Sequence, residues 1–269
     1  MPTIHPTAVV DPNAQIAESA VIGPFCVIGP KVKLADNVKL QSHVVLDGPL
    51  SIGKNTEIYP GAVLGKRTQD LKYSGGEGPV EIGADCMIRE YVTVHQPTTP
   101  DGLTRIGDRC AILAYSHIAH DCRLGNGIIM SNSTNLAGHV IVEDDVVFGG
   151  LGGAHQFVRI GRGAMVGAMA KVVQDIIPFC LVEGNPASPR AVNKVGMERH
   201  DFDKTSITVA QQAFKVIFRS GIRLKEAIDA IRKENGDDRC AQIIIDFLEA
   251  DSNRGIARPQ HPVKGSIDK

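Results

Sequence analysis

The chain of 269 residues has no tryptophan, and its aromatic residues make up only 4% of the sequence. Glycine, with 28 residues, is plentiful. Few aromatic residues and many glycines fit a thin structure with small inward side chains better than a thick globular core. The formal net charge is −1, so no overall positive field indicates nucleic-acid binding. No apolar run reaches membrane-spanning length, and the first residues lack the charged and apolar regions of a signal peptide. We expect a cytoplasmic protein that neither binds nucleic acid nor spans a membrane.

Close cysteine pairs of the zinc-knuckle type are also missing among the six cysteines. Cys26, Cys86, Cys110 and Cys122 share one position of a repeat, described next, where small residues such as Val and Thr stand elsewhere. We expect these four to be inward-facing core residues, as buried free cysteines usually are. Disulfides are not expected in the compartment inferred.

What the sequence does have is an aliphatic residue at every sixth position. From Ile4 to Val172, 29 positions are spaced by six and 26 of them are apolar, the exceptions being Asp70, Gly76 and Pro100. Neither an α-helix nor an alternating strand repeats every six residues. The period predicts a triangular solenoid in which each hexad forms one flat face and three hexads form a coil. About ten coils of roughly 18 residues would then be stacked at the spacing of hydrogen-bonded strands.

Glycine often follows the aliphatic residue of a hexad. We expect these glycines to supply the backbone dihedral angles of tight corners. They are Gly23, Gly29, Gly53, Gly65, Gly83, Gly107, Gly125, Gly149, Gly161 and Gly167.

Two segments interrupt the repeat, at residues 66–79 and 96–104. Both are rich in Gly, Pro and polar residues, so we expect loops that project from one face, where insertions in solenoids often bind ligands. The repeat ends after Val172, and a run of prolines and glycine marks the boundary. We predict a β-solenoid domain over residues 1–188 and an α-helical domain over residues 189–269.

The pattern after the boundary is helical. Asp203 is a candidate N-cap of a helix that ends at Ser220 and Gly221. Two further amphipathic stripes start near Leu224 and Ile243.

Histidines concentrate in one part of the repeat. Four of the nine lie within 39 residues: His117, His120, His139 and His155. In an 18-residue register, His120 lies under Gly138, and Gly138 lies under Gln156. The other histidines flank these positions, so a cluster is expected on three successive coils. Asp121 directly follows His120 and can orient its imidazole.

Three interpretations of this cluster compete. A histidine can act as a general base toward a hydroxyl group. Alternatively, three histidines and a water can form a catalytic zinc shell. Surface histidines without chemistry are the third possibility, and stacking in register disfavours it. Spacing alone does not separate the base from the metal site.

Several short segments resemble the hexapeptide-repeat acyltransferases and, among these, the bacterial UDP-N-acetylglucosamine O-acyltransferases that begin lipid A synthesis. The segments are IGPFC (22–26), QDLKY (69–73), HIAHDC (117–122), LAGHV (136–140), AHQF (154–157), EGNPA (183–187) and FKVIFRSG (214–221). They cover essentially the whole chain, and HIAHDC, QDLKY and LAGHV are the specific ones. The resemblance implies a left-handed parallel β-helix followed by helices, assembled as a homotrimer with active sites between subunits.

The resemblance also implies roles for individual residues. His120 matches the general base that takes the proton of the sugar 3-hydroxyl group, and Asp121 matches the residue that polarises it. Gly138 matches the glycine whose backbone N–H stabilises the oxyanion. Positions that match contacts to the sugar nucleotide or acyl chain are Gln69, Asp70, Lys72, His117, His139, His155, Gln156, Asn193 and Arg199.

The reaction implied is transfer of an (R)-3-hydroxyacyl group from acyl carrier protein to UDP-N-acetylglucosamine, by direct attack on the thioester. It uses no metal and no organic cofactor. Acyl carrier protein is acidic, so a basic surface of Lys215, Arg219, Arg223 and Lys225 is expected to receive it. Ala168 falls where the family sets acyl-chain length, with Met169 beside it, and we expect a slightly shorter chain than in a relative with Gly.

Two positions depart from the family pattern: Val195 stands where an acidic residue is common, and His200 where a second Arg often follows Arg199. A 3-hydroxy sugar and a 3-amino analogue are not distinguished.

Three alternatives are weighed against this interpretation. The QDLKY segment and the helical domain argue against a hexapeptide carbonic anhydrase with zinc. The related N-acyltransferase has an additional N-terminal domain, for which we expect no room because the hexads begin at Ile4. A scaffold without activity gives no reason for His, Gly and His to stack across coils.

Overall fold

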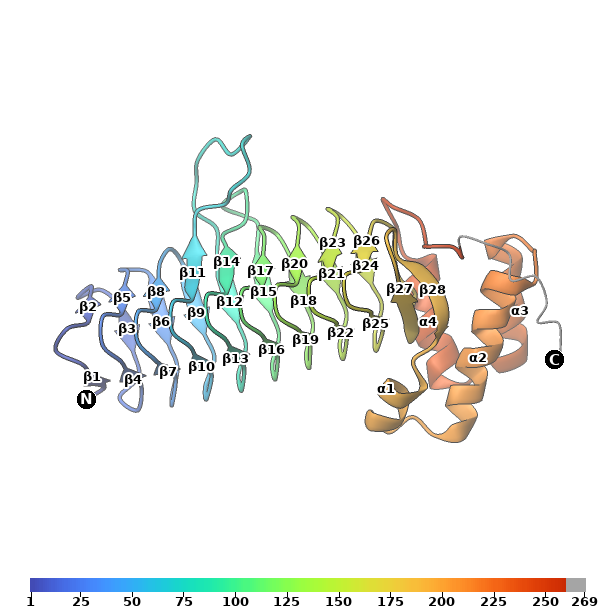
Figure 1. Ribbon diagram of the computed structural model, residues 1–269, viewed down its shortest axis with the longest axis horizontal. Coiled ribbons are helices and arrows are strands. Elements are labelled where there is room, and N and C mark those ends of the chain that lie inside the picture. The colour runs from blue at the N-terminus through green and yellow to red at the C-terminus, as the bar shows by residue number, and fades with distance from the viewer. Residues whose placement is uncertain (260–269) are drawn as a thin grey trace.

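The chain folds into a long solenoid of short parallel strands, capped at its C-terminal end by helices (Figure 1). The structure is a computed structural model that describes residues 1–259. Over these residues the strands form three sheets, one for each face of the solenoid. The first sheet consists of β1 (Thr3–Ile4), β4 (Val21–Ile22), β7 (Lys39–Leu40), β10 (Glu57–Ile58), β13 (Met87–Ile88), β16 (Ala111–Ile112), β19 (Ile129–Met130), β22 (Val147–Phe148), β25 (Met165–Val166), β27 (Cys180–Glu183) and β28 (Ser188–Val192).

The other two faces are built in the same way. The second sheet consists of β2 (Val9–Val10), β5 (Val27–Ile28), β8 (Val45–Leu46), β11 (Val63–Lys66), β14 (Thr93–His95), β17 (His117–Ile118), β20 (Asn135–Leu136), β23 (Gly153–Ala154) and β26 (Lys171–Val172). The third consists of β3 (Gln15–Ile16), β6 (Val32–Leu34), β9 (Leu50–Ile52), β12 (Val80–Ile82), β15 (Thr104–Ile106), β18 (Arg123–Leu124), β21 (Ile141–Val142) and β24 (Arg159–Ile160).

The register confirms the predicted solenoid. Ile4 pairs with Ile22, and Ile118 pairs with Leu136, so residues 18 apart lie directly above one another. The coils number about ten and follow the left-handed course of the β-helix fold. Because each strand between the two end coils pairs with the coil before it and the coil after it, the outward side chains of successive coils are held in fixed rows.

The core is a column of the predicted aliphatic residues. Leu64, Ile118 and Leu136 are fully buried, and the one large ring in this column is Phe148. Each buried aliphatic side chain contributes about 1.5–3 kcal/mol. All six cysteines are buried free thiols, as expected for small inward residues.

The corner glycines have a different role from the one expected. The corner residues with positive φ lie three positions after the aliphatic residue and are mostly not glycine; examples are Asn37 and His139. Each such residue donates its N–H across the coils, as His139 does to the His120 carbonyl at 3.0 Å. Among the glycines expected to adopt such angles, only Gly65 has positive φ. The others stand where coils approach closely: a Cβ on Gly23 would come within 2.7 Å of the Gln41 carbonyl oxygen.

Two excursions leave the solenoid on the same side (Figure 1). The chain departs between β11 and β12 and again between β14 and β15. The two loops are in contact, because a Cβ on Gly78 would meet the Thr99 carbonyl oxygen at 2.5 Å. They project over the face that carries β17 and β20 on the next coils.

Four helices follow the strands within the described residues: α1 (Lys194–Arg199), α2 (Lys204–Arg219), α3 (Leu224–Asn235) and α4 (Arg239–Glu249). Asp203 caps α2 by accepting from the Ser206 N–H at 2.8 Å, and α2 ends at Ser220, as predicted. The short helix α1 has no expected counterpart. None of the helices over residues 1–259 is long and apolar enough to cross a membrane.

The domain boundary after residue 188 stays a prediction. β28 begins at Ser188 and pairs in antiparallel fashion with β27, which in turn stacks on β25 of the last coil. Residues 260–269 of the expected helical domain lie outside the described part of the chain.

Candidate active site

A groove of about 690 Å³ runs along the face formed by the second sheet, from the loop before β12 to the last coil. Toward the last coil the lining includes the exposed apolar side chains of Leu151 and Met169. Most of its histidines lie nearer the loops, whereas His155 lies near the apolar end. Of the residues predicted from sequence, those lining the groove are Gln69, Asp70, His117, His120, Gly138, His155, Gln156 and Met169.

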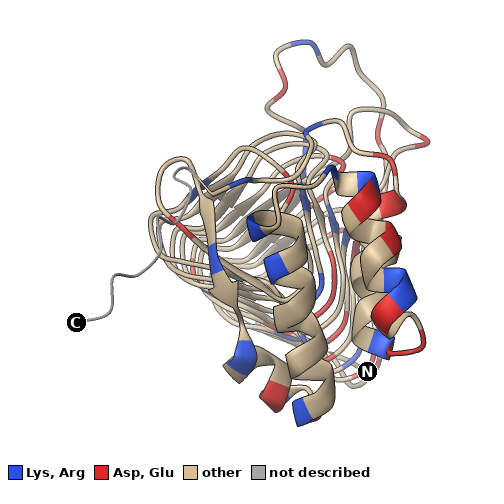
Figure 2. Cartoon of the chain, turned by 90° about the vertical axis from the view of Figure 1, so that its right-hand side faces the viewer, with Lys and Arg blue, Asp and Glu red and all other residues tan. Residues whose placement is uncertain are grey.

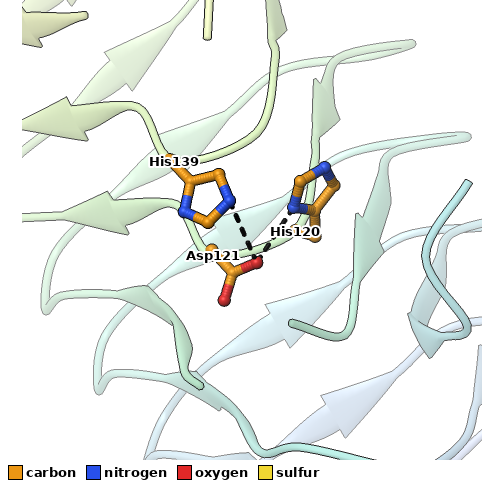
Figure 3. A group of neighbouring side chains, drawn as sticks. All are labelled: His120, Asp121 and His139. Atoms are coloured by element: carbon orange, nitrogen blue, oxygen red, sulfur yellow. Dashed lines mark hydrogen bonds and ion pairs between the residues drawn. The ribbon is translucent and has the colours of Figure 1, made fainter. Parts of the chain in front are cut away.

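His120 lines this groove and is paired with Asp121. The corner after β17 gives Asp121 a φ of 60°, and its N–H donates to the Thr104 hydroxyl oxygen at 2.9 Å. This turn brings the Asp121 carboxylate to His120, whose Nδ1 lies 2.9 Å from Asp121 Oδ2 (Figure 3). Because a carboxylate only accepts, Nδ1 carries the proton, and Nε2 of a neutral His120 is left as the acceptor.

Asp121 is held by the second loop as well. Its Oδ2 accepts from the Thr98 N–H at 3.1 Å and from the Thr98 hydroxyl at 2.8 Å. Burial opposes ionisation of Asp121, but the hydrogen bonds from His120 and Thr98 outweigh it and hold the pKa of this carboxyl below its ordinary value. Asp121 is therefore a fixed anion near neutral pH. The sequence indicated a binding loop here but did not indicate that Thr98 would hold Asp121.

Gly138, on the next coil, lies directly against the His120 ring. A Cβ at this position would overlap His120 Cε1 and Nε2, so only glycine leaves room for the imidazole. The Gly138 N–H donates to no other residue in the described part of the chain. The structure thus brings an acceptor nitrogen and an unused backbone donor together in one groove, as the 18-residue register predicted.

His139 lies on the corner beyond the groove lining. Its Nε2 is 3.6 Å from Asp121 Oδ2, and its ring stacks on Phe157 with centroids 4.6 Å apart. Burial lowers the pKa of His139 even though the Asp121 carboxylate opposes that shift. With Asp121 it lines a second, smaller cavity of about 340 Å³ on the adjoining face.

His120, Asp121 and His139 are also the one group among residues 1–259 whose ligand atoms converge as a metal site would need, all within 4.8 Å. Two imidazoles and a carboxylate match a catalytic zinc shell in composition. However, the Asp121 oxygen nearest both rings already accepts two hydrogen bonds from Thr98. The geometry fits an oriented histidine base better than a metal centre.

The groove is also lined by His95, a buried histidine that the sequence interpretation missed. His95 is only 6% exposed and makes an edge contact with His117, with ring centroids 4.9 Å apart. Burial, reinforced by His117 and His120, lowers the pKa of His95 to about 4. Burial and then His120 lower the pKa of His117, whose Nδ1 is 2.7 Å from the Thr93 hydroxyl. Both rings are therefore neutral at pH 7.

Other predicted residues lie away from this groove within one chain. Asn193 caps α1, accepting from the Gly196 N–H at 3.0 Å and donating to the Gly163 carbonyl at 2.9 Å. Arg199 is the exposed last residue of α1, and Lys72 is exposed on the first loop. Ala168 is exposed beside Met169 but does not line the groove.

His200, where relatives of the expected family often have Arg, lies near Asp145. Its Nδ1 is 3.5 Å from Asp145 Oδ1, and Arg162 binds the other carboxylate oxygen at 2.9 Å.

The fold and the site together define a hexapeptide-repeat β-helix with a carboxylate-oriented histidine in an apolar groove, a combination suited to acyl transfer.

Comparisons with known proteins agree with this class. Residues 175–257 match the family model described as UDP N-acetylglucosamine O-acyltransferase, domain 2. The acyl-[acyl-carrier-protein]–UDP-N-acetylglucosamine O-acyltransferase of Synechocystis sp. is 53% identical over 230 residues, which are 86% of this chain and 83% of the relative. The enzyme of that name from Sinorhizobium fredii is 43% identical over 82% of each chain.

Solved structures agree as well. LpxA from Acinetobacter baumannii has a TM-score of 0.91 and 42% identity, covering 95% of this chain and 99% of that one. The UDP-N-acetylglucosamine acyltransferase of Francisella novicida has a TM-score of 0.93 and 36% identity, covering 97% and 95%. The chain belongs to the acyl-[acyl-carrier-protein]–UDP-N-acetylglucosamine O-acyltransferase family.

Proposed function

We propose that this protein transfers an (R)-3-hydroxyacyl group from acyl carrier protein to the 3-hydroxyl group of UDP-N-acetylglucosamine, the first step of lipid A synthesis. Membership of the family supports the substrates. The observation that carries the chemistry is the pairing of His120 with Asp121, with the His120 ring against Gly138 in the groove.

In the proposed mechanism His120 Nε2 takes the proton of the sugar hydroxyl as its oxygen attacks the thioester carbon. The new C–O bond forms while the carbonyl electrons move onto oxygen, and the Gly138 N–H is placed to stabilise this oxyanion. When the tetrahedral intermediate collapses, the C–S bond breaks, and the imidazolium returns its proton to the thiolate of the carrier. The Asp121 carboxylate stabilises the imidazolium in between, as in other oriented histidine bases.

The two ends of the groove suit the two parts of the substrate. Leu151 and Met169 offer apolar surface for an acyl chain, whereas Gln69 and Asp70 offer polar groups for the sugar. We propose that Met169, with its neighbour Ala168, limits the length of the acyl chain at the far end. Lys72 is assigned to the diphosphate, since a mobile ammonium group suits such an anion.

A homotrimer is part of the proposal. Asn193 and Arg199 lie outside the groove of their own chain. They can contact the sugar nucleotide only if each subunit contributes them to the groove of a neighbouring subunit. An active site between subunits accounts for this separation.

Acyl carrier protein is proposed to dock on the helices at the C-terminal end, where Lys and Arg stand among acidic residues (Figure 2). Lys215, Arg219 and Lys225 are exposed there. Arg223 is exposed too, but it forms an ion pair with Glu226, so we expect it to contribute least.

The test is an acyl-transfer assay with UDP-N-acetylglucosamine, its 3-amino analogue and 3-hydroxyacyl carrier proteins of several lengths, with the metal content of the protein recorded. We expect product with the 3-hydroxy sugar, with a metal-free preparation fully active. Product only with the 3-amino analogue would overturn the choice of sugar. Activity lost on chelation and restored by zinc would instead favour the metal site of His120, Asp121 and His139.

A further inference from the structure

The segment after α4 returns to the solenoid and is fastened beside its last coil, where it is drawn in red in Figure 1. Gly255 accepts from the Asp175 N–H at 2.8 Å, and the Ala257 N–H donates to the Asp175 carbonyl at 2.8 Å. Arg159 of β24 donates to the carbonyls of Ala250 and Asp251 at 3.1 and 2.9 Å. These bonds fix residues 250–257, which we call the C-terminal strap, against the sheet that adjoins the groove.

Arg254 reaches from this strap to the edge of the groove. Its Nη2 lies 2.8 Å from His155 Nδ1, and its Nε donates to the Gln156 carbonyl at 2.8 Å. The guanidinium thus bridges the side chain of His155 and the backbone of the next residue, both of which line the groove. The hexad register gives no reason for this contact, because the partners are 99 residues apart.

The chemistry of arginine decides where the proton of His155 resides. A guanidinium has five N–H donors and no acceptor, and it keeps its charge at all relevant pH values. His155 Nδ1 must therefore be the unprotonated, accepting nitrogen. Nδ1 is also 3.4 Å from the Gln156 carbonyl, but that oxygen already accepts from Arg254 at the shorter distance of 2.8 Å. The remaining proton of a neutral ring stands on Nε2.

We propose that Arg254 is a positioning residue that holds His155 as the Nε2–H tautomer, so that the ring presents a hydrogen-bond donor to an oxygen of the bound sugar nucleotide. The inference rests on the proposed function for the identity of that ligand. Phosphate and carbonyl oxygens only accept hydrogen bonds. In the opposite tautomer Nε2 would also be an acceptor, so it could not bond such an oxygen. Losing the guanidinium frees Nδ1 to take the proton instead.

Two readouts test the proposal, and one of them needs no activity. Nitrogen-15 NMR of histidine-labelled protein, with His155 assigned from the His155→Gln spectrum, reports which ring nitrogen carries the proton. We expect Nε2–H in the wild type, a shift toward Nδ1–H in Arg254→Met, and partial retention in Arg254→Lys. In steady-state kinetics Arg254→Met should raise KM for UDP-N-acetylglucosamine about tenfold, as for a lost hydrogen bond to a charged group, and change kcat less.

Arg258→Met is the matched control. Arg258 directly follows the strap and donates to the Ile217 carbonyl of α2 at 3.2 Å, and it does not line the groove. It should leave both the His155 tautomer and KM unchanged. A wild-type His155 protonated on Nδ1 would overturn the inference, as would a KM increase in Arg254→Met without any change of tautomer. If no acyl transfer occurs at all, the proposed function fails while the NMR result still decides the tautomer.

Discussion

The coils near the N-terminus and the coils around the groove are built alike and differ in what stands two residues after each strand of the second sheet. After β5 and β8 this row holds Pro30 and Gly48, whereas after β17 and β20 it holds His120 and Gly138. The strands before them pair in the same register, and their inward residues, such as Ile28 and Ile118, are equally buried. The scaffold is constant, and the chemistry depends on outward residues of a few coils.

This difference implies that activity and stability can be separated by mutation. A core aliphatic residue in either group of coils supports the same stacking, so truncating it to Ala should cost about 2–5 kcal/mol in either place. An outward residue of the groove lies outside the aliphatic column and should affect mainly the reaction. The predictions below test this separation.

Gly138→Ala should have the largest effect. The added Cβ overlaps the His120 ring, so the imidazole must move away from the Gly138 N–H. We expect kcat/KM for acyl transfer to fall about 10²-fold, comparable to loss of one oxyanion donor. Gly150→Ala, where a Cβ would come no closer than 3.2 Å to any atom, is the control and should stay active. A fully active Gly138→Ala enzyme would contradict the arrangement.

Thr98→Val should have the next largest effect. It removes the hydroxyl that donates to Asp121 at 2.8 Å but keeps the shape of the side chain. We expect kcat to fall about tenfold, since a hydrogen bond to a charged group is worth about 1.5–3 kcal/mol. Thr98→Ser, which restores the donor, should recover most of the rate. Equal losses in the two variants would show that the loop conformation matters rather than the hydrogen bond.

Met169→Ala should change specificity more than rate. Met169 lines the apolar end of the groove, so its truncation should shift the preferred 3-hydroxyacyl chain to a greater length, by up to about tenfold in relative kcat/KM per methylene. The measurement compares carrier proteins loaded with a series of chains. Tyr115 occupies the same corner row but lies outside the groove lining, and Tyr115→Ala should leave the preference unchanged. An identical preference in all three proteins would refute the assignment.

His95→Gln should alter the pH dependence of stability. The pKa of His95 is about 4 in the folded protein, against an ordinary histidine value of 6.5. Between these values the unfolded chain binds a proton that the folded chain does not, so the free energy of unfolding falls as pH drops through this window. The full loss is about 3 kcal/mol at roughly 1.4 kcal/mol per unit. Urea denaturation across the window should show a shallower loss in the variant, and parallel curves would contradict the effect.

The sequence was sufficient to predict the part of the site that obeys the repeat. A period of six determines the triangle, and the triangle places His120, Gly138 and Gln156 in one row on successive coils. The resemblance added the roles of these residues. No comparable rule connects an insertion to a coil, so the bonds from Thr98 to Asp121 were not predicted.

Contacts between distant segments were missed for the same reason. Arg254 meets His155 because the strap docks on the last coil, which depends on how α4 packs and not on any local pattern. The glycine prediction was wrong because close approach of coils, rather than backbone dihedral angles, selects glycine at positions such as Gly23. The period shows which positions of the coils are equivalent, but it does not show how closely the backbones of neighbouring coils approach one another there.

The most direct test of the account measures acyl transfer and thermal unfolding of the same His120→Gln protein. His120 faces the groove and contributes nothing to the aliphatic column, so the account predicts a melting temperature close to that of the wild type. It also predicts a loss of about 10²–10⁴ in kcat, the usual contribution of a general base. A folded His120→Gln enzyme that transfers the acyl group at nearly the wild-type rate would contradict the central claim.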